Sequence, residues 1–73
     1  MDNLERWVIN NIGDGNRNNM LLRYAMILLD GGFDFENIRQ RVMTLNNKIA
    51  DKLDEAEVMS TIMITVAKTI SKR

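Results

Sequence analysis

The sequence predicts an all-α protein, a compact bundle of four helices in a single domain. Apolar residues recur at intervals of three and four rather than two, which is the period of a helix and not of a strand. Proline is absent, and the four glycines fall in two pairs where that period breaks, Gly13/Gly15 and Gly31/Gly32. A chain of 73 residues has room for one modest core, so we expect residues 1–73 to form one unit.

The first two predicted helices differ in how much of their surface is apolar. The first is expected over residues 3–11, with Asp2 as N-cap and Glu5 as its capping-box partner. The second, residues 17–30, is apolar on nearly every side apart from Arg23. A helix of this kind is expected at the centre of a bundle, covered by the others. The apolar face expected for the first helix is Leu4, Trp7, Val8 and Ile12.

The third and fourth predicted helices begin with the same signals. The third opens at Asp34 and runs to about Ile49, and the fourth covers residues 55–71, with Asp54 as N-cap and Glu57 as its reciprocal partner. Because a short turn joins them, we expect the two helices to pack as antiparallel neighbours. The stripe expected to be buried on the fourth helix is Met59, Ile62, Met63, Val66 and Ile70.

The composition excludes several kinds of chemistry. Histidine and cysteine are both absent, which excludes disulfides and the usual zinc, haem, iron–sulfur and thiol sites. We therefore expect no metal and no cofactor. Serine and threonine nucleophiles would lack a histidine base, so the chain is not expected to be an enzyme by itself, although it can be an accessory part of one.

Neither a targeting segment nor a membrane span is predicted. The longest apolar run is Met20–Leu29, interrupted by Arg23, whereas a span needs about 18 residues. The amino end lacks the basic region of a signal peptide, so a cytoplasmic protein without membrane contact is expected. Ten Lys and Arg residues balance ten Asp and Glu residues, which disfavours a general polyanion binder but permits a local basic face.

Two groups of acids have spacings that could suggest catalysis. Asp34-Phe35-Glu36 has the spacing that metal-dependent nucleotidyl transferases use, but that chemistry needs both carboxylates on one side, as a strand provides. On a helix, Asp34 is an N-cap and Glu36 lies in the first turn, where negative charge suits the helix dipole. Capping is the favoured interpretation here and also for the acids at residues 54–57.

The most unusual segment is the polar loop before the second helix. A helix start presents unpaired N–H groups and a positive dipole end, and arginine and asparagine there would add donors suited to a phosphate or a carboxylate. The loop lacks the Gly-Lys-Ser/Thr of a Walker motif. The alternative is a loop with an asparagine cap and an arginine paired to a nearby acid. The candidate binding residues are Gly15, Asn16, Arg17, Asn18 and Asn19.

A second candidate is a basic face on the third helix. Arg41, Lys48 and then Lys52 recur on one side at helical spacing. Because most acids lie near predicted helix starts, these cations have no close sequence partner on their face. Together with the basic carboxyl-terminal tail they could follow a nucleic-acid backbone. The alternative is an ordinary solvated helix exterior.

Apolar residues give a third candidate, a surface for a protein partner. The chain has six methionines, which could form an adaptable groove for a partner helix but more commonly fill a small core. Ile64 falls on the outward side of the last helix, near Lys68. These two residues are the candidate partner contacts, although a single exposed isoleucine is usually without function.

From Gly15 onward the sequence resembles the small C-terminal helical domain of phage and plasmid primases. That family shows Gly-x-Arg-Asn, an apolar helix, a Gly-bearing turn, Leu-Asn, and Leu-x-x-x-Glu-Val at the start of the last helix. The resemblance covers residues 15–69, with residues 1–12 as an additional N-terminal helix. The proline of the family before the last helix is replaced by Asp51-Lys52. The matching residues are Gly15, Arg17, Asn18, Gly32, Leu45, Asn46, Leu53, Glu57 and Val58.

The resemblance implies a role in DNA replication of a mobile element. In that family the helical domain engages template or nucleotide and contacts the helicase part, while catalysis lies elsewhere. We therefore expect a non-catalytic module that binds single-stranded DNA or nucleotide phosphates and positions them for a primase catalytic subunit or replicative helicase. Asn16, Arg17 and Asn18 become the binding candidates. The rival hypothesis is a protein–protein adaptor or inhibitor acting on a replication protein.

Overall fold

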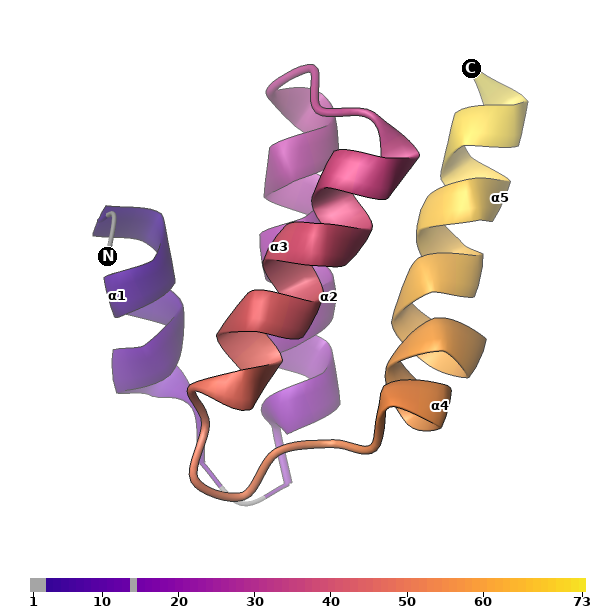
Figure 1. The fold of residues 1–73 in the computed structure, drawn as a ribbon. Helices are drawn as coiled ribbons and strands as arrows, with labels where there is room; N and C mark the ends of the chain where they lie inside the picture. Colours follow the sequence, from indigo (N-terminus) through magenta and orange to yellow (C-terminus); the bar gives the residue numbers. More distant parts are fainter. Residues whose placement is uncertain (1–2, 14) are drawn as a thin grey trace.

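The structure, a computed structural model, describes residues 3–13 and 15–73 as an all-helical bundle without strands in those ranges (Figure 1). Helix α1 spans Asn3–Asn11, α2 spans Arg17–Asp30 and α3 spans Phe35–Asn47. The last helical segment is continuous and consists of α4 (Glu55–Glu57), a π-helical stretch η1 (Val58–Met63) and α5 (Ile64–Lys72). The predicted all-α fold with four helical segments is confirmed.

Helix α2 is the centre of the bundle, as its apolar composition predicts. It packs against α1, α3, η1 and α5. Its side chains supply a large share of the core, since an apolar surface in contact with several neighbours is removed from water on several sides. The buried residues of α2 are Met20, Leu21, Tyr24, Ala25, Leu28 and Leu29.

The turn between α2 and α3 uses the glycine pair. Gly32 has a φ of +93°, a left-handed conformation that glycine adopts without penalty, and the next residue, Phe33, donates its N–H to the Leu28 carbonyl at 3.1 Å. Asp34 then caps α3, because its Oδ1 accepts a hydrogen bond from the Asn37 N–H at 2.8 Å. Asp34 therefore has the capping role that the sequence favours.

The last helical segment differs from its prediction in which residues it buries. Val58, Ile62, Met63 and Val66 are buried, whereas Met59 and Ile70, both expected in the buried stripe, are each 38% exposed. A π-helical stretch carries more residues per turn than an α-helix and so shifts the buried face. The hydroxyl of Thr61 donates to the Glu57 carbonyl at 2.7 Å, a bond that competes with the backbone ladder at the start of this stretch.

The link between α3 and α4 is fixed by one buried amide. Asn46 is 1% exposed; its Nδ2 donates to the Leu53 carbonyl at 2.8 Å, and its Oδ1 accepts from the Leu53 N–H at 3.0 Å. The side chain of Asp54, predicted to cap the last helix, makes no capping hydrogen bond. Leu53, held by Asn46 and itself buried, sets the chain direction into α4.

Helix α3 and the last helical segment run antiparallel, as predicted, but each packs chiefly on α2 and less on the other (Figure 1). At the lower end of Figure 1 the α1–α2 loop and the α3–α4 loop lie side by side. The candidate site is located at this end.

Candidate functional site

A pocket of about 370 Å³ opens between the α1–α2 loop and the α3–α4 loop. Its apolar wall comes from isoleucines of α1 and of the two loops, and its cations come from the first residue of α2 and from the C-cap of α3. Two candidate residues that are far apart in sequence, Arg17 and Lys48, therefore meet at one concavity. The lining residues are Ile9, Ile12, Gly13, Arg17, Lys48, Ile49, Ala50 and Asp51.

Arg17, the first residue of α2, points its guanidinium at the α3–α4 loop. Its Nη1 lies 3.1 Å from the Asp51 carboxylate and also donates to the Asp51 carbonyl. This is the ion pair that the structural alternative for the loop predicts. The pair does not use all donors of the guanidinium, because the buried Nε of Arg17 has no hydrogen-bond partner among the described residues.

The asparagines of the loop are mostly engaged in holding it. The Oδ1 of Asn16 accepts from the Gly13 N–H at 2.6 Å, and its Nδ2 donates to the Asn11 carbonyl at 2.9 Å. Asn18 donates to the Thr61 hydroxyl at 2.7 Å, which ties α2 to η1. Both side chains are therefore engaged within the fold, which leaves the main-chain N–H groups, Asn19 and the Arg17 guanidinium as donors at this helix start.

The remaining two residues of the loop motif play different parts. Gly15 has a φ of +90°, which favours glycine at this turn. Asn19 is exposed on the first turn of α2. Neither lines the pocket.

Lys48 is held by a carboxylate that the sequence did not assign to it. Its Nζ lies 3.2 Å from Oε2 of Glu5, a side chain only 11% exposed. The hydroxyl of Tyr24 approaches the other oxygen of Glu5 at 3.5 Å. Lys48 has no acid close to it in the sequence on its own face, but α1 brings Glu5 to it from 43 residues away. The predicted cap at Asp2 lies outside the described residues.

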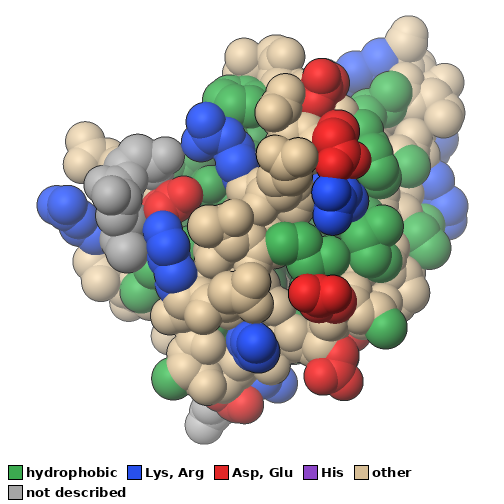
Figure 2. Space-filling view, viewed as in Figure 1, with side chains coloured by type: hydrophobic (Ala, Val, Ile, Leu, Met, Phe, Trp, Pro, Cys, Tyr) green, Lys and Arg blue, Asp and Glu red, His purple; other side chains and the backbone are tan. Residues whose placement is uncertain are grey.

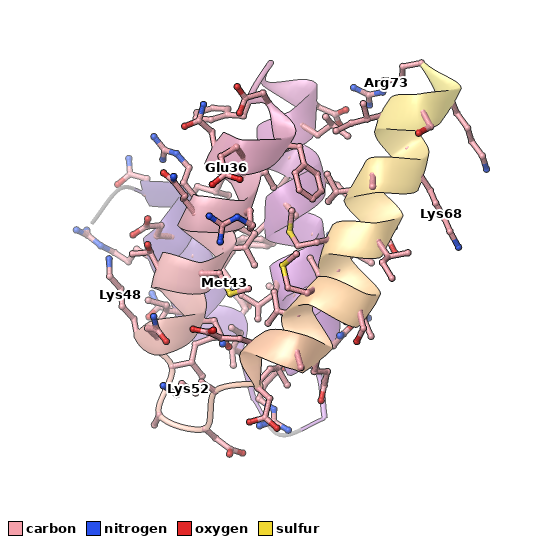
Figure 3. All side chains as sticks on the ribbon, turned by 45° about the vertical axis from the view of Figure 1, so that its right-hand side comes forward. Glu36, Met43, Lys48, Lys52, Lys68 and Arg73 are labelled. Carbon is pink, nitrogen blue, oxygen red and sulfur yellow. The ribbon has the colours of Figure 1, made fainter. Side chains whose placement is uncertain are left out.

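The other cations of the predicted basic face are also in contact with neighbours. The guanidinium carbon of Arg41 lies 4.6 Å from the centre of the Phe33 ring, and Lys52 donates to Oδ1 of Asn47 at 3.4 Å. Figure 3 shows Lys48 and Lys52 at the pocket end of the molecule. Arg41 is two helical turns away and does not line the pocket. Acidic and basic side chains are interspersed on this face, so it is not a uniform basic strip (Figure 2).

One exposed ion pair on α3 shifts the pKa of both partners. The guanidinium of Arg39 donates to the carboxylate of Glu36. This hydrogen bond lowers the pKa of Glu36 and raises the pKa of Arg39 from their ordinary values. Glu36 is therefore an exposed, ion-paired residue in the first turn of α3, in agreement with the capping interpretation of this acidic cluster.

The candidate partner contacts lie on the outer side of α5. Ile64 is exposed, and Lys68 extends away from the bundle in Figure 3. Trp7 is the residue whose position the sequence predicted least well. It was expected on the buried face of the first helix, yet it is 41% exposed.

Within residues 3–13 and 15–73, no group of three or more acidic side chains is arranged to hold a metal ion. No helix in the same part of the chain is both long enough and apolar enough to cross a membrane.

The fold is that of a small helical module, with a pocket in which Arg17, Lys48 and Asp51 come together. Residues 5–63 match the family Primase C terminal 1 (PriCT-1), and the chain belongs to this family, which associates it with primases and DNA replication. The matched range begins within α1, before the Gly15 at which the resemblance in the sequence starts. No curated protein and no solved structure matches the chain.

Proposed function

We propose that this chain is a non-catalytic module of a mobile-element primase system that binds phosphate groups of single-stranded DNA or of a nucleotide. It positions them for a partner primase catalytic subunit or replicative helicase. The observation that carries the proposal is the convergence of Arg17 and Lys48 on one pocket. Membership in the PriCT-1 family supports the association with a primase.

The chemistry of the pocket suits a phosphate with an apolar or aromatic group attached. Arg17 supplies a planar fork of donors. Its buried Nε makes no hydrogen bond within the described residues, so no bond at this atom is lost when a ligand binds. Ile9, Ile12 and Ile49 supply the apolar wall. A ligand phosphate would compete with the carboxylate of Asp51, which is 74% exposed and readily solvated when displaced.

This competition gives a test with opposite signs. Arg17→Ala removes the donors and should weaken binding of a dodecathymidylate, whereas Asp51→Asn removes the competing charge and should tighten it. A purely structural ion pair would make both variants behave alike. Arg39→Ala is the matched control, since Arg39 also pairs with a carboxylate, that of Glu36, but does not line the pocket.

Amide chemical shifts locate the binding. Titration with the dodecathymidylate at two salt concentrations should move residues 13–19 and 48–51. With Arg17, Lys48 and Lys52 engaged, the logarithm of affinity should fall with the logarithm of salt with a slope of about −2, at roughly 0.7 per phosphate of a single strand. An absence of salt-dependent shifts in these two segments would refute the proposal.

A second candidate function is a protein–protein adaptor or inhibitor acting on a replication protein. It is favoured by three large apolar side chains exposed on the last helical segment, Met59, Ile64 and Ile70. Ile64→Glu would then abolish retention of a primase or helicase partner after nuclease treatment, while leaving oligonucleotide binding intact. Retention that disappears with nuclease favours the nucleic-acid function.

A further inference from the structure

Trp7 and Arg23 form an exposed pair of an aromatic and a cationic side chain, outside the pocket. Trp7 lies on α1 and Arg23 on α2, and the guanidinium carbon of Arg23 is 5.7 Å from the centre of the indole ring. At 41% exposure, much of this indole faces solvent. An indole normally buries its large apolar area. The exposure of the single tryptophan of this chain therefore points to a ligand that covers it.

In residues 3–13 and 15–73, no carboxylate forms an ion pair with Arg23. Arg17, Arg39, Lys48 and Arg73 each lie within salt-bridge distance of a carboxylate. Arg23 has no such partner among the described residues. Helix α2 carries no acid before Asp30, and the one acid of α1, Glu5, is turned inward to Lys48. The exposed Arg6 adds a further positive charge next to Trp7 in the sequence.

These features select a ligand that has both a flat π face and a negative charge. A nucleotide with an unpaired base meets both conditions, because the base can stack on the indole and the phosphate can contact the guanidinium. A base inside a duplex is already stacked and offers no free face. A partner protein would have to desolvate Arg23 and supply its own acid.

We propose that Trp7 and Arg23 form a stacking site for an unpaired base of single-stranded nucleic acid. This inference rests on the proposed function and adds a second contact to it. Trp7 and Ile9 are two residues apart, so they project about 160° apart around α1. The pocket therefore lies on one flank of α1 and the stacking site on the other, and a bound strand crosses this helix.

The single tryptophan makes the site directly observable. In the wild-type chain, a dodecathymidylate should quench Trp7 fluorescence, and an abasic oligomer with the same number of phosphates should not. Anisotropy of a fluorescein-labelled oligonucleotide then compares variants. Trp7→Leu keeps the apolar bulk but removes the π face, and should weaken binding about tenfold. Trp7→Phe keeps a stacking plane and should stay within about threefold of wild type.

The outcomes separate this inference from the proposed function. Weaker binding of the dodecathymidylate by both Trp7→Leu and Arg23→Gln, with binding of the abasic oligomer unchanged in Trp7→Leu, supports it. Wild-type affinity in Trp7→Leu, together with a loss in Arg17→Ala, overturns the stacking site and leaves the pocket standing. If the wild-type chain does not bind the dodecathymidylate, both are overturned. Should Trp7→Leu fail to fold, absence of quenching in the wild-type chain overturns the inference by itself.

Discussion

Asn46 should be the polar residue on which the stability of the bundle depends most. It is buried, and its amide makes both a donor and an acceptor bond to the backbone of Leu53, at 2.8 and 3.0 Å. Asn46→Ala removes both bonds and leaves a buried N–H and a buried carbonyl unpaired. At about 0.5–1.5 kcal/mol for each bond lost, plus the desolvation of the orphaned groups, the cost should be about 2–4 kcal/mol.

This loss is large for a chain of 73 residues, whose free energy of unfolding is expected at roughly 4–11 kcal/mol. Urea denaturation followed by helical circular dichroism measures it. With a slope of about 1 kcal/mol per molar urea, the midpoint should fall by about 2–4 M. The control is Asn47→Ala, the next residue, which is exposed and bonded only to Lys52 in the described chain.

Asn46→Asp tests the direction of each bond. The carboxylate can still accept from the Leu53 N–H, but it opposes the Leu53 carbonyl when ionised. Burial should raise the pKa of this carboxyl in the folded state, so the variant should gain stability as pH falls through that pKa. For the alanine variants, equal urea midpoints of Asn46→Ala and Asn47→Ala would refute the conclusion that the buried amide of Asn46 stabilises the bundle.

Three smaller perturbations probe other parts of the fold. Gly32→Ala should cost roughly 1–2 kcal/mol, seen as a lower melting temperature, because φ is +93° there; an unchanged melt would contradict the turn. Val58→Ala should cost about 2 kcal/mol in urea denaturation and Met59→Ala clearly less, since only Val58 is fully buried; the reverse order would restore the stripe predicted from sequence. NMR titration should place the pKa of Glu36 below its ordinary value, so that its pairing with Arg39 stabilises the fold at neutral pH and is lost as pH falls through the lowered pKa; an ordinary pKa that Arg39→Gln does not change would show that the pair is not formed in solution.

The helices were predictable from local signals. The bounds of α1 and α2 agree with the sequence because glycines end the apolar period on both sides of α2, and its composition places it at the centre. The last helical segment was less predictable. A 3.6-residue period assigns Met59 to the core, but η1 changes the number of residues per turn, and Val58 is buried instead. The hydrogen bond of Thr61 that accompanies this change could not be predicted from the apolar pattern of the sequence, because it involves a polar side chain.

The sequence singled out two of the residues that line the pocket as candidates, but it did not indicate that they lie together. Arg17 and Lys48 stand out as cations at helix positions, yet they belonged to two separate predicted sites. They lie together because the α3–α4 loop, held at Leu53 by Asn46, places Asp51 against Arg17. Trp7 was assigned to the core because it shares the face of Val8, and periodicity cannot show that α2 leaves one edge of that face uncovered.

The two cations of the pocket are unequal because their carboxylate partners differ in burial. Lys48 neutralises Glu5, which is largely shielded from water, so moving Lys48 toward a ligand would leave a poorly solvated charge behind. Arg17 neutralises Asp51, which water can solvate as soon as the pair opens. Arg17 is therefore the residue that can exchange partners at low cost, while Lys48 contributes its charge from a fixed position. The same asymmetry makes Asp51→Asn the more informative variant, because it removes the competitor of a ligand without disturbing the contact between α1 and α3.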